Sequence, residues 1–283
     1  MCRENQEINS PQFNLDLSLE RSCKKTFLRD QFSCYPFHIC KPHYLDESPA
    51  GLATIYLQSS AGGIFSGDTL NARFKVGPGS QAHVTSQAST VVHTMKNSGA
   101  KTNILIRVGE QALFEYLPDP LILFPKANLA ARLHLEIDES STVLLCDSYL
   151  THDPYQSGGY FSQLANETTI TDKQGSLLCL DRSVIEGRDF SQNEIGIMGA
   201  RRVVGTFYYI NRSTDSNRVC ELLNNALGRC SDIYAGVSTL PNKIGAWARI
   251  IATDVAPLRE AVDKMWRASR ADITGYQPAT SRK

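Results

Sequence analysis

The sequence of 283 residues lacks an excess of either charge, because 29 basic and 29 acidic side chains cancel. Without a net positive charge, neither nucleic acid nor an anionic membrane surface is an expected partner. Long apolar segments are also missing, since no stretch approaches the roughly 18 consecutive apolar residues of a membrane span. The first twenty residues have no apolar segment behind a basic start, as a secretory signal would have. The sequence therefore predicts a cytoplasmic protein.

Motifs of nucleotide-binding and hydrolytic enzymes are missing as well. The segment 62–68 is rich in glycine, but no Lys followed by Ser or Thr is present to bind phosphate and magnesium, and Asp68 would repel a phosphate. Neither a Gly-x-Ser-x-Gly nor a His-Glu-x-x-His motif occurs. We interpret Gly62, Gly63 and Gly67 as a structural turn in which the backbone approaches its neighbours closely.

The cysteines are scattered along the chain, and reduced thiols are expected in a protein of this size and compartment. One group resembles a metal site: Cys34, His38, Cys40 and His43 offer four nitrogen or sulfur ligands to zinc or nickel. Its spacing matches no standard zinc finger, and the same residues also fit as core cysteines and surface histidines. A zinc-binding β-sandwich hydrolase or lyase that uses these four residues is the alternative function.

Short runs of β-branched and aromatic residues, separated by turn residues, predict a mainly β fold up to about residue 212. The segment 77–80 (GPGS) has the signature of a type II turn, which predicts a hairpin of the strands before and after it. The spacing favours a multi-stranded β-sandwich or β-solenoid-like domain. Strands are expected at 52–57, 71–76, 81–86, 103–108, 112–117, 129–137, 143–146, 167–171, 177–180 and 203–210.

The pattern changes after residue 212 to a helix, a hairpin and a second helix. Helical spacing predicts one helix over 217–227, ended by a left-handed Gly228, and another that starts after Asp254. Strands are expected at 233–240 and 244–253. We predict four parts: a flexible tail over 1–20, a β-rich domain over 21–212, a C-terminal α/β region over 213–270 packed on it, and a tail over 271–283.

Four carboxylates lie beside apolar strands or glycine turns: Asp68, Glu115, Asp119 and Asp147. A buried carboxylate is costly unless it is paired or binds a cation. For any one of them, pairing with an arginine is the simpler interpretation, and Arg73, Arg132, Arg182 and Arg201 are the candidate partners. The set as a whole still makes these residues candidate ligands for a cation.

Several motifs in the same order resemble the urease accessory protein family UreD, called UreH in some organisms. They are 36–38 (PFH), 60–68 (SAGGIFSGD), 77–79 (GPG), 85–90 (TSQAST) and 114–124 (FEYLPDPLILF). The chain departs from the family pattern at Val91, at His93 and around residues 152–159. The resemblance implies a largely β, non-catalytic protein that assembles with the helical UreF and the GTPase UreG on apo-urease. It also implies nickel delivery through an internal tunnel.

A nickel conduit must bind the ion weakly, which favours sparse carboxylates over a closed Cys/His site. On this reading we expect transient Ni²⁺ and no tightly bound cofactor. Asp68 is the first candidate for nickel transit and Asp147 the second, followed by Glu115 and Asp119. UreF is expected to contact the C-terminal helices and nearby strands, because an apolar helix stripe suits a helical partner.

Overall fold

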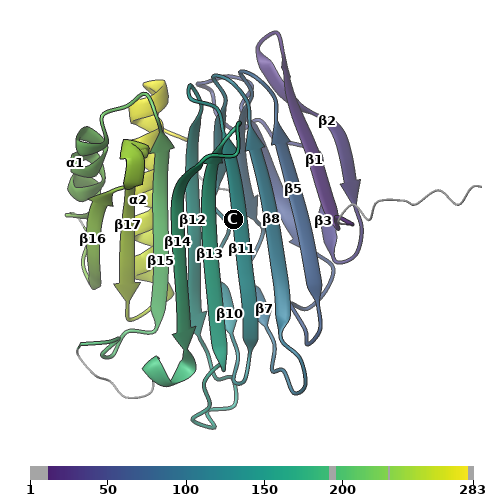
Figure 1. Cartoon of the computed structure of the whole chain (residues 1–283), viewed down its shortest axis with the longest axis vertical. Helices are drawn as coiled ribbons and strands as arrows, with labels where there is room; N and C mark the ends of the chain where they lie inside the picture. Colours follow the sequence, from purple (N-terminus) through teal and green to yellow (C-terminus); the bar gives the residue numbers. More distant parts are fainter. Residues whose placement is uncertain (1–11, 191–195, 229, 280–283) are drawn as a thin grey trace, which may run out of the picture.

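The computed structural model describes residues 12–190, 196–228 and 230–279, which form two β-sheets and two α-helices (Figure 1). The seven-stranded sheet has the order β14 (Leu177–Glu186), β13 (Gln163–Asp172), β11 (Asn128–Ile137), β8 (Ala100–Val108), β5 (Thr69–Val76), β1 (Leu15–Ser22) and β2 (Lys25–Ser33). The ten-stranded sheet has the order β16 (Ile233–Thr239), β17 (Gly245–Ala252), β15 (Val203–Asn211), β12 (Thr142–Thr151), β9 (Leu113–Tyr116), β6 (Gln81–Ser86), β4 (Ala53–Ser59) and β3 (Phe37–Ile39). Two short strands, β7 (Thr90–Val92) and β10 (Leu121–Leu123), pair with each other, and β10 also pairs with β12.

The chain winds between the two sheets as in a solenoid. Strands β5, β8, β11 and β13 run parallel in one sheet, and β4, β6, β9 and β12 run parallel in the other. At the end of this winding, β14 pairs antiparallel with β13 in one sheet and β15 pairs antiparallel with β12 in the other. The expected mainly β, sandwich- or solenoid-like fold is confirmed. Side chains that alternate along the strands, such as Phe74, Phe114 and Leu135, fill the core between the sheets.

The predicted hairpin at residues 77–80 is wrong, although the turn itself forms. Gly79 has φ +64, as the third position of a type II turn requires. However, β5 pairs with β1 and β8, whereas β6 pairs with β4 and β9 in the other sheet. The turn therefore carries the chain across the sandwich. Local turn chemistry fixes the change of direction but leaves open which strand becomes the hydrogen-bonded neighbour.

The C-terminal part is a helix, a hairpin and a helix, as predicted. Helices α1 (Ser216–Leu227) and α2 (Val255–Thr274) cover the outer face of the ten-stranded sheet over β15 and β17, as Figure 1 shows. Asp254 caps α2 by accepting a hydrogen bond from Val255 N–H. A short 3₁₀ turn, η2 (Pro241–Lys243), links the strands of the hairpin. Gly228 is right-handed at φ −60, which corrects the expected left-handed end of α1.

The predicted N-terminal tail ends too late in the chain, and the predicted C-terminal tail begins too early. Leu15, Leu17 and Leu19 of β1 are fully buried between the sheets, so residues 15–20 are part of the core. Their period-two spacing is that of a strand with one buried face. At the other end α2 continues to Thr274 and thus includes residues 271–274. Among the described helices, none is both long and apolar enough to cross a membrane.

Candidate functional site

A buried ionic network lies where α2 crosses the ten-stranded sheet. Glu115 of β9 is fully buried, and its neighbours Phe114 and Tyr116 point to the opposite face of the strand, into the core between the sheets. Arg270 donates two hydrogen bonds of 2.6 Å to the Glu115 carboxylate, one from Nε to Oε1 and one from Nη2 to Oε2. His83 Nδ1 lies 2.8 Å from Glu115 Oε2. The carboxylate thus has a charged partner in Arg270.

Helix α2 supplies two of the partners because Trp266 and Arg270 are four residues apart and share one helix face. Trp266 donates from Nε1 to Glu115 Oε2 at 2.8 Å, and its ring stacks on His83 at 5.0 Å. Arg270 also donates from Nη1 to Asp46 Oδ2 at 3.0 Å. Burial alone would raise the pKa of Glu115, but the charge and hydrogen bonds of Arg270, with that of His83, hold it at about 2. The network therefore fixes α2 on the sheet.

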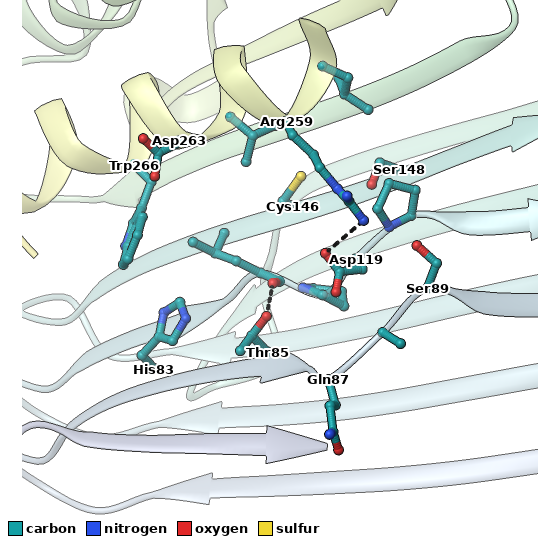
Figure 2. Close-up of a pocket in the computed structure, with 16 residues that line it drawn as sticks. His83, Thr85, Gln87, Ser89, Asp119, Cys146, Ser148, Arg259, Asp263 and Trp266 are labelled. Atoms are coloured by element: carbon teal, nitrogen blue, oxygen red, sulfur yellow. Dashed lines mark hydrogen bonds and ion pairs between the residues drawn. The ribbon is translucent and has the colours of Figure 1, made fainter. Parts of the chain in front are cut away.

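A cavity of about 490 Å³ adjoins this network, between the first turns of α2 and the ends of β6, β9 and β12. Figure 2 shows Arg259 and Trp266 of α2 on one side of it and His83 of β6 on the other. Asp119 follows β9, and its Oδ1 lies 3.7 Å from Arg259 Nη2. Asp119 N–H donates to Ser86 Oγ at 2.8 Å. Among the four predicted acids, Asp119 is the one that lines this cavity.

A second polar cluster lies on the other face of the ten-stranded sheet, between the two sheets. Asp147 of β12 is half-buried and accepts a hydrogen bond from Asn166 of β13, so it links the two sheets. Burial raises the pKa of Asp147 to about 6, against the hydrogen bonds of Asn166 and Thr206. The nearby charge of Asp181 acts in the same direction as burial. A carboxylate with so high a pKa has few partners that stabilise its charge.

Asp181 of β14 is the second acid of this inter-sheet cluster. It accepts hydrogen bonds from Tyr208 OH at 2.6 Å and from Arg249 Nη2 at 2.7 Å. The hydroxyl of Tyr149, two residues beyond Asp147 on the same face of β12, is buried and has no hydrogen-bond partner among the described residues. Such a group is expected to bind a water molecule or another polar ligand.

The four predicted acids lie on three different surfaces. Glu115 and Asp119 are on the helix-covered face of the ten-stranded sheet, and Asp147 is between the sheets. Asp68 lies in the loop before β5, where its Oδ2 accepts a hydrogen bond of 2.8 Å from Phe65 N–H. Asp68 and Asp119 lie in the segments that follow β4 and β9, at the end of the sandwich where these strands finish. Asp147 lies toward the same end of β12, because it is two residues beyond Leu145, which pairs with Tyr116 at the end of β9. The described residues do not bring the acids together in one metal site.

The structure does not bring together the four residues of the predicted Cys/His metal site. Cys40 Sγ lies 4.0 Å from His38 Nε2, and Cys34 Sγ instead accepts a hydrogen bond from Asn14. His43 bridges to Thr54 through its backbone. No group of three metal-binding side chains forms in the described chain, which includes all four of these residues. The seven cysteines that the structure describes are unpaired.

The glycine turn contains two positions at which the backbone requires glycine. Gly63 has φ +140, and a Cβ there would lie 2.2 Å from the carbonyl oxygen of Val91. Gly67 has φ +85. At Gly62 a Cβ would meet nothing within 4 Å, so packing does not explain that residue. The close approach at Gly63 lets Ile64 N–H donate to Val91 at 2.8 Å.

The sequence did not reveal the arginine partners of Glu115 and Asp181. Sequence reasoning named Arg73, Arg132, Arg182 and Arg201 as possible partners, whereas the structure uses Arg270 for Glu115 and Arg249 for Asp181. Helical spacing of Trp266 and Arg270 was visible in the sequence. Nothing in the sequence indicated that their shared face meets β9, which is more than a hundred residues earlier.

Comparisons with known proteins agree with the resemblance seen in the motifs. A family model described as UreD urease accessory protein matches residues 12–283. Urease accessory protein UreD 1 of Pseudomonas syringae pv. syringae (strain B728a) is 34% identical over 249 residues, covering 88% of this chain and 87% of that protein. Urease accessory protein UreD 1 of Methylorubrum extorquens (strain PA1) is 33% identical over 267 residues, covering 94% and 90%. Urease accessory protein UreD 2 of Brucella suis biovar 1 (strain 1330) is 25% identical over 264 residues.

Proposed function

The chain belongs to the UreD urease accessory protein family, and from this premise we propose that it binds apo-urease together with UreF and UreG and helps deliver nickel. The family consists of accessory proteins and not of catalytic enzymes. The observation that carries the proposal is the extent of the family match, which spans both sheets and both helices. The chain acts in this proposal as a scaffold, and the GTPase chemistry belongs to UreG.

The assembly can be tested by co-purification. A tagged copy of the full chain is expressed with UreF, UreG and the urease subunits, and the proteins retained with it are identified. We expect UreF, UreG and urease all to be retained with the tagged chain. Failure to retain urease or UreF under conditions in which the chain is folded would contradict the proposal.

The structure changes one part of the expected UreF contact. The apolar stripe of α2, which contains Leu258, Met265 and Trp266, is buried against the chain's own sheet. It is therefore not available to a helical partner. Deleting the whole of α2 would not test a contact on its surface, because the deletion removes Arg270 and leaves Glu115 buried without its charged partner. Point substitutions on the exposed surface of the helices are needed instead.

We propose further that the inter-sheet cluster around Asp147 is the place where nickel meets this chain. A dication in transit needs oxygen ligands that are not already saturated by other partners. Glu115 is surrounded by donors and paired with Arg270, so we assign it to the stability of the fold. Asp147 has an amide partner in Asn166 and a raised pKa, which a bound cation would lower. Asp68 and Asp119, at the same end of the sandwich, are the proposed acids nearer the surface.

The route is tested by substituting Asp147→Asn and measuring both complex assembly and the nickel bound to urease after maturation. Glu136→Gln is the matched control, because Glu136 pairs with Arg107 on strands of the other sheet. We expect both variants to assemble with their partners and only Asp147→Asn to reduce nickel delivery. Normal nickel delivery by an assembled Asp147→Asn chain would remove Asp147 from the route and leave the scaffold role in place.

A further inference from the structure

Strand β16 is an open edge of the ten-stranded sheet. Its only strand neighbour among the described residues is β17, and Figure 1 shows it as the last strand of the sheet, beside α1. The strand has the sequence IYAGVST, without a charged residue or a proline. An open strand edge presents unpaired backbone N–H and C=O groups to any other strand that approaches it. The edge is therefore competent to extend the sheet.

The other sheet edges carry the features that prevent such pairing. The outer strand β2 contains Lys25, Arg29 and Asp30, and β14 contains Asp181 and Arg182. Charged residues on an edge strand oppose the approach of another strand, and short edges offer few hydrogen bonds. The third edge, β3, is only three residues long. Among these edges β16 alone is both long and uncharged.

Gly236, at the centre of β16, has no explanation within the chain. A Cβ at this position would meet nothing within 4 Å, and its φ is not in the left-handed region. Glycine in the interior of a strand weakens it, and it often marks a site where another backbone approaches closely. Two residues before it, Tyr234 is 68% exposed, with its ring 5.4 Å from the Arg201 guanidinium.

These features suit a second copy of the same strand. In an antiparallel pair centred on Gly236, the two glycines face each other, Ala235 faces Val237, and Tyr234 faces Ser238. Each Tyr234 is then diagonal to the partner's glycine, within reach of an aromatic side chain, and an aromatic ring over a glycine is a known way to stabilise an edge. No like charges face each other, because the strand has none. The strand is thus complementary to itself.

We propose that β16 pairs antiparallel with β16 of a second copy of this chain, which joins two ten-stranded sheets across a two-fold axis. The seven residues of the strand make this a small contact. Reversible dimerisation that depends on protein concentration is therefore expected. The proposal does not depend on the proposed function.

The test is sedimentation of the full chain over a range of concentrations, with charges introduced at the axis. Gly236→Lys places two lysines opposite each other in the dimer, and Gly236→Glu places two glutamates there. The added side chains have open space, so both variants should fold, and thermal melting checks this. We expect the dimer dissociation constant to rise about tenfold or more in each variant. Mixing the two variants should restore the dimer, because Lys then faces Glu.

Gly196→Lys is the matched control, since a Cβ at Gly196 also meets nothing within 4 Å and the residue lies outside β16. This variant should dimerise like the unmodified chain. The proposal is overturned if the unmodified chain stays monomeric at every concentration at which it is soluble. It is equally overturned if either charged variant of Gly236 dimerises as well as the unmodified chain, which would place the contact elsewhere.

Discussion

Replacing Arg270 with methionine should strongly destabilise this fold. Arg270 is 1% exposed and pairs with Glu115, which is 0% exposed. Methionine retains much of the apolar stem but removes the charge, so Glu115 is left with His83 and Trp266 as partners. Breaking a buried ion pair by removing one partner costs about 3–5 kcal/mol, because the other charge stays buried without compensation.

The pKa of Glu115 gives an independent magnitude. The pKa falls from an ordinary value of 4.5 to about 2 in the native protein. At about 1.4 kcal/mol for each unit of pKa shift, the lowered pKa corresponds to about 3 kcal/mol of stability. The native pKa lies below the unfolded one, so this contribution is complete above about pH 4.5 and is lost as the pH falls toward 2. A domain has roughly 5–15 kcal/mol in total, so the loss is a large fraction.

The assay is urea unfolding at neutral pH, followed by tryptophan fluorescence, because Trp266 contacts Glu115 directly. Arg267→Met is the matched control: Arg267 is on the same helix, 31% exposed, and pairs with Asp263 one turn away, so its loss should cost at most about 1 kcal/mol. Adding Glu115→Gln to Arg270→Met should recover part of the lost stability. If Arg270→Met costs no more than the control, the network does not hold α2 in place.

Three other predictions follow from the same structure. The native pKa of Asp147, about 6, lies above its ordinary 3.8, so the ionised carboxylate opposes folding at pH 7. Asp147→Asn should therefore raise the free energy of unfolding at pH 7 by up to about 3 kcal/mol. The stabilities of the variant and the unmodified chain should converge as the pH falls toward 4, and a difference that persists at pH 4 would contradict this prediction. Gly63→Ala should destabilise by more than about 2 kcal/mol in urea unfolding, whereas Gly62→Ala should change little, and equal effects would show that the contact with Val91 is not decisive. Cys34→Ser should leave the zinc content measured by mass spectrometry unchanged, and a loss of bound zinc would restore the discarded metal site.

The sequence was sufficient for most of the longer elements after residue 50, because most of these strands have one buried face. Alternation in β5 and the helical spacing in α2 predicted those elements to within a few residues of the observed bounds. The same reasoning missed β1, where Leu15, Leu17 and Leu19 alternate among polar residues near the start of the chain. The motifs within residues 60–68 and 114–124 carried the family, because their order and spacing together are specific.

Strand pairing and the site could not be predicted in the same way. The turn at residues 77–80 was recognised from its composition, but whether it links neighbours in one sheet or crosses between sheets depends on the whole winding. Likewise, the contact of Arg270 with Glu115 joins residues 155 positions apart, and no local pattern encodes it. The candidate acids were chosen from their neighbours in the sequence, but the faces on which Glu115 and Asp147 lie follow from the register of β9 and β12, which is a property of the assembled sheet.

The most direct test of the central claim is the nickel content of urease matured with and without this chain. Apo-urease, UreF, UreG and nickel are combined in the presence or absence of the full chain, and the metal bound to purified urease is measured. If the chain helps to deliver nickel, urease takes up substantially more nickel when the chain is present. Equal nickel content with and without the chain, in a mixture where the chain is folded and bound to its partners, would contradict the central claim.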